Sequence, residues 1–158
     1  MTLTPNKNIW YGIQIRDPLL ISGTSLRRLV KLAVSVLPVP LVAIRRVEWL
    51  GPPSLFPRLG NADTGVVTVD EFLNRAAGAT QFIWGDFFFI EDPASVSLDR
   101  IPFEYAKVLA RARFLICAVD NMYYYVVTQS PELSNLLKQS YPDASVEEHE
   151  LHELRFPS

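Results

Sequence analysis

The stretch Gln81-Phe-Ile-Trp-Gly-Asp-Phe-Phe-Phe-Ile90 decides the fold, because it is the strongest strand candidate in the sequence. Its aromatic and β-branched residues are the types most enriched in strands. Apolar residues occupy both faces of such a strand. A sheet with two apolar faces must be covered on both. We therefore expect helices, or a partner, on each side. The two-residue period of a strand places five residues on one face: Phe82, Trp84, Asp86, Phe88 and Ile90.

Strand and helix patterns alternate along the rest of the chain. Asp120-Asn121 tolerates positive φ and predicts a tight hairpin, which favours antiparallel pairing. The predicted fold class is α+β: a mixed, largely antiparallel sheet of about five to six strands with four helices packed on it, in a single domain over residues 1–158. Strands are expected over residues 9–15, 41–50, 80–90, 114–119, 122–128 and 150–156, and helices over residues 25–36, 69–77, 102–111 and 131–140.

Two segments are harder to assign. The C-terminal Ser145-Val-Glu-Glu148 matches a capping box and favours a helix, whereas the alternation of Leu154 with Phe156 favours a strand, which we expect over Glu150 to Phe156. The proline-rich stretch from Gly51 to Gly60 is expected to be a rigid loop rather than a linker, since its flanking pieces are too short to be separate domains.

Composition limits the classes of protein to which the chain can belong. Apolar residues make up 49% and charged residues 20%, which places the chain among globular rather than disordered proteins. The apolar stretch from Leu32 to Ile44 is shorter than the roughly 20 residues of a spanning helix, and residues 1–10 lack the apolar core of a signal peptide. One cysteine, Cys117, cannot form an internal disulfide. We expect a cytoplasmic protein with no membrane contact.

The charge distribution is uneven, although the net charge is only −2. Residues 1–60 carry eight Lys or Arg and two acids, whereas residues 61–158 carry seven Lys or Arg and fifteen acids. The pairs Arg27-Arg28 and Arg45-Arg46 could touch phosphate, but they lack interleaved glycine and aromatic residues. We therefore expect no nucleic acid partner, and the asymmetry is weak evidence for a polar surface that meets another protein.

Recognisable catalytic motifs are missing from the sequence. It contains no phosphate-binding glycine loop, no dinucleotide fingerprint, no nucleophile elbow and no calcium loop. Cys117 lies in an apolar run, where a buried hydrophobe is a commoner role than an activated nucleophile. His149 and His152 would share one face of a helix and could then hold a metal, but a solvated acidic edge is the commoner meaning. We expect a non-enzymatic protein without metal or cofactor.

Asp86 is the most informative single residue, because a carboxylate among aromatic side chains must be paired, protonated or exposed. One interpretation places it at a sheet edge, where it reaches water or a helix N-terminus. The other makes it part of a recognition surface with neighbouring aromatic residues, since such clusters resemble binding hot spots. Tyr123, Tyr124 and Tyr125 form a second aromatic cluster. The candidate partner-binding residues are Trp84, Asp86, Phe88, Tyr123, Tyr125, Glu147, Glu148 and Glu150.

The last third of the chain resembles small uncharacterised bacterial proteins, including immunity partners of secreted toxins. The resemblance is carried by the strand Phe114-Leu-Ile-Cys-Ala-Val-Asp120, the aromatic strand from Tyr123 to Thr128, and the helix that opens at Ser130-Pro-Glu. It implies a cytoplasmic, non-enzymatic binding protein. Our leading hypothesis is an immunity protein that inhibits a protein toxin, and a basic toxin domain would suit the acidic C-terminal part. The alternative is a small-molecule sensor or an unclassified enzyme with a pocket around Asp86. The sequence leaves the oligomeric state open.

Overall fold

The computed structural model describes residues 9–16, 22–56, 64–93, 98 and 103–157. Its centre is a seven-stranded sheet with the strand order β3-β2-β4-β5-β6-β1-β7, in which every neighbouring pair is antiparallel. The strands are β1 (Ile9–Ile15), β2 (Leu41–Leu50), β3 (Thr64–Thr68), β4 (Gln81–Ile90), β5 (Ala112–Val119), β6 (Tyr123–Thr128) and β7 (Ser145–Glu150).

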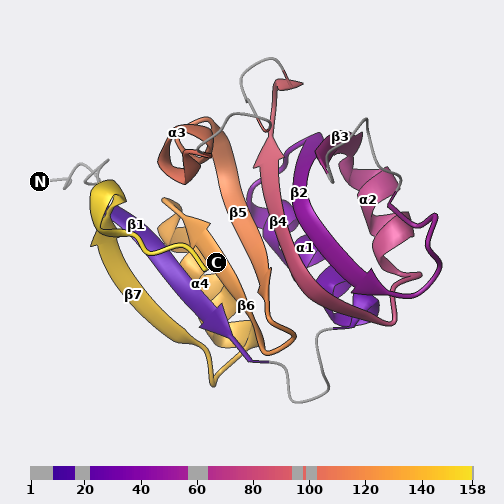
Figure 1. Ribbon diagram of the computed structural model, residues 1–158. Coiled ribbons are helices and arrows are strands. Elements are labelled where there is room, and N and C mark those ends of the chain that lie inside the picture. The colour runs from indigo at the N-terminus through magenta and orange to yellow at the C-terminus, as the bar shows by residue number, and fades with distance from the viewer. Residues whose placement is uncertain (1–8, 17–21, 57–63, 94–97, 99–102, 158) are drawn as a thin grey trace, which may run out of the picture.

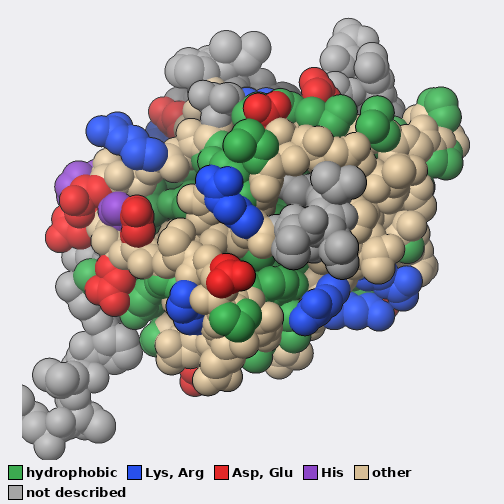
Figure 2. All heavy atoms as spheres, turned by 90° about the horizontal axis from the view of Figure 1, so that it is seen from below, with side chains coloured by type: hydrophobic (Ala, Val, Ile, Leu, Met, Phe, Trp, Pro, Cys, Tyr) green, Lys and Arg blue, Asp and Glu red, His purple; other side chains and the backbone are tan. Residues whose placement is uncertain are grey.

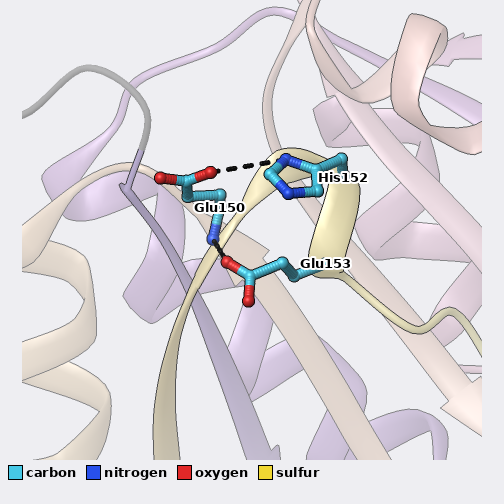
Figure 3. A group of neighbouring side chains, drawn as sticks. All are labelled: Glu150, His152 and Glu153. Carbon is cyan, nitrogen blue, oxygen red and sulfur yellow. Dashed lines mark hydrogen bonds and ion pairs between the residues drawn. The ribbon is translucent and has the colours of Figure 1, made fainter.

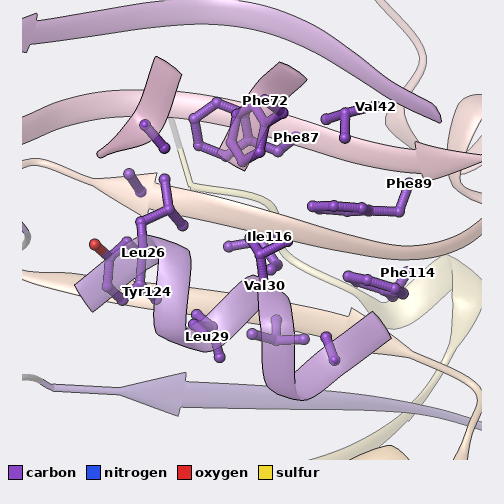
Figure 4. Close-up of a cluster of buried hydrophobic side chains, with 14 of the residues drawn as sticks. Leu26, Leu29, Val30, Val42, Phe72, Phe87, Phe89, Phe114, Ile116 and Tyr124 are labelled. Atoms are coloured by element: carbon purple, nitrogen blue, oxygen red, sulfur yellow. The ribbon is translucent and has the colours of Figure 1, made fainter. Parts of the chain in front are cut away.

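Three helices cover one face of the sheet: α1 (Gly23–Val36), α2 (Val69–Ala76) and α4 (Pro131–Ser140). Figure 1 shows α1 and α4 behind the strands. Apolar side chains at helical spacing on α1 meet the sheet, where the rings of Phe89 and Phe114 are stacked at 4.3 Å (Figure 4). Burial of these side chains is the main source of stability on this face. We call it the helix face.

Short polar side chains begin these helices. Ser22 caps α1, Thr68 caps α2 and Ser130 caps α4, and each side chain accepts a hydrogen bond from the backbone three residues on. Pro131 follows Ser130 in the first turn of α4, where its missing N–H costs nothing. These caps satisfy backbone donors that would otherwise be unpaired at the helix N-termini.

Described residues cover only part of the opposite face of the sheet. The short helix α3 (Tyr105–Leu109) and the segment 151–157, which begins with the 3₁₀ turn η2 (Leu151–Glu153), pack on a second apolar cluster. Figure 1 shows α3 at the upper end of the sheet and the C-terminus in front of it. We call this face the open face. Its buried members include Trp10, Phe88, Leu115, Val127 and Leu154.

Both faces of β4 are apolar, and its side chains alternate from Trp84 to Ile90, but on the open face Trp84 is only partly buried. Phe82 departs from this alternation: it packs with Phe56 and Phe87 on the helix face, although the two-residue period predicts the open face. The cause is a register shift against β2, where Glu48 is opposite Trp84 but Trp49 is opposite Phe82. An extra residue in one strand reverses the facing of the residues beyond it.

The α+β class and the largely antiparallel sheet are confirmed, and the sheet has one strand more than the upper estimate. The additional strand is β3, a short Thr-Gly-Val-Val-Thr edge strand that sequence reasoning missed. The expected hairpin is present, because Asp120 and Asn121 have φ of 46° and 58° and Met122 N donates to Val119 O. This is the geometry of a two-residue turn.

The C-terminal prediction is wrong in its boundaries. The final strand covers Ser145–Glu150, including the residues that match a capping box, and residues 151–153 form a 3₁₀ turn instead of a strand. Pairing with β1 overrides the local helix signal. The third helix, expected over residues 102–111, covers only Tyr105–Leu109, since the described residues 103 and 104 are not helical. Pro102 lies outside the described residues, as do residues 57–60 of the Gly51–Gly60 loop. Within the described part of the chain, no helix is long and apolar enough to cross a membrane.

Candidate functional site

A row of residues in direct register crosses the middle of the open face. Arg45 on β2 is opposite Asp86 on β4, Asp86 is opposite Cys117 on β5, Cys117 is opposite Tyr125 on β6, and Tyr125 is opposite Gln14 on β1. Residues opposite one another in paired strands point to the same face. Strand pairing therefore brings together a carboxylate, a guanidinium, a thiol, a phenol and an amide from five segments of the chain.

Asp86 is the centre of a buried polar cluster. Its Oδ2 accepts hydrogen bonds from Arg45 Nη1 at 3.1 Å, from Arg46 Nε at 3.1 Å and from the Tyr105 hydroxyl at 2.7 Å. Only 3% of Asp86 is exposed, so its charge is balanced by these donors and not by water. The guanidinium of Arg45 also lies 3.8 Å from the centre of the Phe103 ring.

A bend in β2 allows two consecutive arginines to reach the same carboxylate. Arg46 has a φ of 55°, in the left-handed region that non-glycine residues rarely adopt, and the pairing of β2 with β4 shifts just after Arg45. In a regular strand the two side chains would point to opposite faces. The bulge turns Arg46 toward Asp86, and such features often re-aim a side chain for a purpose.

The same cluster holds the C-terminal segment in place. Arg46 Nη2 donates to the Tyr105 hydroxyl and, at 3.3 Å, to the carbonyl oxygen of Pro157. The ring of Phe156 stacks on Tyr105 with a centroid distance of 4.6 Å. The polar cluster therefore fastens residues 156–157 and α3 over the upper part of the open face.

The acid–base properties of this cluster disfavour an activated nucleophile. Burial raises the pKa of the Cys117 thiol well above its usual value, and the neighbouring Asp86 raises it further. Burial and Asp86 likewise raise the pKa of Tyr105. Burial alone would lower the pKa of Arg46, but the Asp86 carboxylate more than reverses this and raises it. The thiol and the phenol are thus held neutral, and the guanidinium is held charged.

Half-buried aromatic side chains lie beside the Asp86 cluster, on the part of the open face that no described helix covers. They are Trp84, Tyr123 and Tyr125, all packed at the margin of the second apolar cluster. Met122, at the tip of the adjoining hairpin, is 54% exposed. We call the surface formed by Trp84, Tyr123 and Tyr125 the aromatic surface. Large aromatic residues of this kind are enriched at the centres of protein interfaces.

Gly12 connects the aromatic surface to the acidic edge of the sheet. A Cβ atom at Gly12 would lie 2.3 Å from the Tyr125 hydroxyl, so only glycine allows this ring to lie across β1. Gly12 is opposite Glu147 of β7, which points to the same face. Burial and then the charge of Glu147 raise the pKa of Tyr125 to about 12. The structure thus brings Tyr125 and Glu147 together.

The edge strand β7 and the turn after it carry exposed acids. Figure 2 shows acidic and histidine side chains gathered on one flank of the molecule. His149 contacts Glu147 at 2.9 Å, whereas His152 lies in the next turn (Figure 3), so the two histidines do not form one metal set. Ligand atoms of Glu150, His152 and Glu153 lie within 4.8 Å of one another, but all three residues are exposed and Glu153 Oε1 is engaged by the Glu150 backbone N–H. The hydrogen bond between Glu150 and Glu153 within this turn explains why the three side chains lie close together.

The sequence-predicted site residues are therefore divided among three places. Trp84, Tyr123, Tyr125 and Glu147 share the open face and its rim, whereas Glu148 and Glu150 point to the helix face of β7. Phe88 is fully buried and Asp86 nearly so, which corrects their assignment to a partner surface. The edge interpretation of Asp86 is also wrong, because β4 is an inner strand and the carboxylate is paired with arginines rather than with water or a helix N-terminus.

Sequence reasoning missed the partners of Asp86 as well as Met122. The sequence alone suggests only a phosphate contact for Arg45 and Arg46, and it contains no signal for Tyr105. Their contacts with Asp86 span 19 to 41 residues of sequence, so only strand pairing reveals them. The one signal in the sequence is Asp86 itself, because a carboxylate among aromatic residues must be paired, protonated or exposed.

Comparison of the chain with known proteins found no matching family model, no matching curated protein and no matching solved structure.

Proposed function

We propose that this chain is a non-enzymatic binding protein that holds a protein partner on its aromatic surface. The observation that carries the proposal is the position of Trp84, Tyr123 and Tyr125 on one sheet face, half-exposed, with no described helix over them. The opposite face of the same sheet packs a large apolar cluster under the described helices α1, α2 and α4. Tryptophan and tyrosine supply much contact area at low entropic cost, which suits them to a recognition surface.

The acids beside this surface favour a basic partner, although the guanidinium of one cation, Arg16, also lies there, 5.7 Å from the centre of the Tyr123 ring. Glu48, opposite Trp84, and Glu147, opposite Gly12, are both exposed on the open face. The acidic edge strand β7 extends this charge beyond the face. Complementary charge at the rim of an interface speeds association and sets orientation. Together with the resemblance to immunity partners, this charge pattern makes a basic toxin domain the partner class that we propose, in a cytoplasmic setting.

The ligand-binding alternative receives less support from the geometry of Asp86. A substrate or sensor site would use this carboxylate as a free acceptor or base. Instead, its Oδ2 already accepts from two arginines and a tyrosine, and this cluster fastens the C-terminal segment. The arrangement is explained by a structural role, so we propose no reaction for it.

Affinity capture from the cells that make the protein tests the proposal. The baits are the wild-type chain, Tyr123→Ala, Glu147→Lys and the control Asn74→Ala, which changes an exposed residue of α2 on the other side of the sheet. We expect one basic protein to be enriched by the wild type and by the control, and to be lost with the other two baits. Enrichment of no protein, or equal enrichment by all four folded baits, would count against the proposal.

A further inference from the structure

The outward side of α1 forms a basic groove that the aromatic surface does not involve. Thr24, Arg27, Arg28, Lys31 and Ser35 line an open hollow of about 520 Å³, with Leu32 as its apolar member. The helix contains three cations and no acid. Figure 2 shows Lys and Arg side chains gathered at the lower right, away from the acidic flank. We call this hollow the α1 groove.

The cations of the α1 groove have no carboxylate partner in the part of the chain that the structure describes. Arg28 and Lys31 are exposed, and the contact recorded for Arg28 is with the Tyr141 ring, 5.4 Å from its guanidinium carbon. The Nε of Arg27 is buried and has no hydrogen-bond partner among described residues. Three neighbouring like charges repel one another, so an anionic occupant would relieve an unfavourable arrangement.

An extended acidic segment matches the spacing of these cations. Arg27 and Lys31 are four residues apart, a rise of about 6 Å along a helix. Side chains on one face of a strand recur at about 6.6 Å. Two acids separated by one residue on a strand would therefore face Arg27 and Lys31 together.

The chain itself carries such a segment on β7. Glu148 and Glu150 are exposed at helix-face positions of this edge strand, where Glu150 also contacts His152 at 3.4 Å, and Val146, which is 37% exposed, shares this face. Val146 offers an apolar counterpart to Leu32 of the groove. The helix α4 lies between α1 and β7 in the fold and contacts both, so the two surfaces of one molecule do not meet.

We propose that the α1 groove binds the β7 strand of a second copy of this chain. Glu148 and Glu150 of one copy pair with the cations of the other, and Val146 packs on Leu32. The contact joins two different surfaces, so it is heterologous and leaves one groove and one strand free for a further copy. This contact uses the helix face of β7, whereas the proposed function uses the open face of the sheet. The two proposals can therefore be tested separately.

Sedimentation velocity on the purified chain at about 100 μM measures this association. Exposed ion pairs are screened by salt, so the average mass should exceed that of a monomer at about 0.02 M NaCl and fall to it at about 0.5 M. Arg27→Gln/Lys31→Gln removes the two groove cations whose spacing matches the strand, and Glu148→Gln/Glu150→Gln removes the two acids on the helix face of the strand. Each variant alone should associate at least about tenfold more weakly. The matched control is Arg111→Gln/Asp143→Asn, which neutralises one exposed cation and one exposed acid elsewhere.

An equimolar mixture of the two neutralised variants gives the decisive result. One retains the acidic strand and the other retains the basic groove, so together they make a single contact. We expect the mixture to form dimers without larger species, while the control behaves as the wild type. A chain that is monomeric at low salt, an association that survives both double substitutions, or a mixture that stays monomeric would each overturn the proposal.

Discussion

Arg46 donates a hydrogen bond from its Nε to Asp86 at 3.1 Å, although regular strand geometry would point its side chain to the other face of the sheet. The left-handed backbone at Arg46 brings a second cation to a carboxylate that Arg45 already contacts. The strain of this conformation, on the order of 1–3 kcal/mol, is offset by the ion pair and by the bond to Pro157. The polar cluster thus holds α3 and residues 156–157 against the open face.

Asp86→Ala should destabilise the fold by about 2–3 kcal/mol, because it leaves Arg45, Arg46 and Tyr105 without their shared acceptor. This destabilisation is at the lower end of the usual cost of breaking a buried ion pair, since the Arg46 side chain is 38% exposed. Urea unfolding followed by circular dichroism measures the change. Asp143→Ala, an exposed substitution, serves as the control and should stay within about 0.5 kcal/mol. An equal, small effect from both variants would show that the cluster contributes nothing to stability.

Phe156→Ala should loosen the C-terminal segment by removing the ring that stacks on Tyr105. We expect a loss of about 1–2 kcal/mol, because the ring is half-buried and aromatic pairs add to simple burial. Hydrogen exchange should rise in residues 151–157 and in α3 more than in α4 on the opposite face. A uniform rise throughout the domain would contradict a local fastening.

Gly12→Ala should displace the Tyr125 ring, because the new methyl group would lie 2.3 Å from the hydroxyl. We expect a cost of about 1 kcal/mol in the wild-type background. In the Tyr125→Ala background the same substitution should cost less, which gives a coupling energy of at least about 0.5 kcal/mol in a double-mutant cycle. Additive effects would show that the two residues do not meet.

Alkaline pH should weaken the fold through Tyr125, whose pKa is raised from 10.0 to about 12 by burial and then by Glu147. The folded chain holds the phenolic proton to higher pH than the unfolded chain does. The resulting stability is therefore complete below pH 10 and is lost as the pH rises through about 12. Unfolding at stepped pH should show a smaller loss over this interval for Tyr125→Phe. Parallel curves for the two proteins would be inconsistent with this pKa.

Much of the fold follows from local sequence signals, and the exceptions have a common physical cause. The alternation from Trp84 to Ile90 and the Asp120-Asn121 turn depend on neighbouring residues, and both are predicted correctly. The facing of Phe82 depends on a register shift against β2, and the extent of β7 depends on β1. Local patterns contain no information on such pairing.

The candidate site shows the same division between local and long-range information. The aromatic residues Trp84, Tyr123 and Tyr125 could be selected from the sequence because their type is characteristic of recognition surfaces. Their position on one uncovered face follows from the order β4-β5-β6, which only the structure shows. The roles of Asp86 and Phe88 were misassigned, since burial arises from α3 and the segment 151–157, both distant in sequence from Phe88.

The dissociation constant of the captured partner for Trp84→Ala, compared with the control Asn74→Ala, tests the central claim most directly. Trp84 lies on the aromatic surface opposite Glu48, and calorimetry on folded protein, verified by its melting curve, separates binding from stability. If this surface holds the partner, Trp84→Ala should weaken binding by about 2 kcal/mol, or roughly 30-fold, while Asn74→Ala leaves it unchanged. An unchanged dissociation constant for Trp84→Ala, or an equal loss for both variants, would contradict recognition through the aromatic surface.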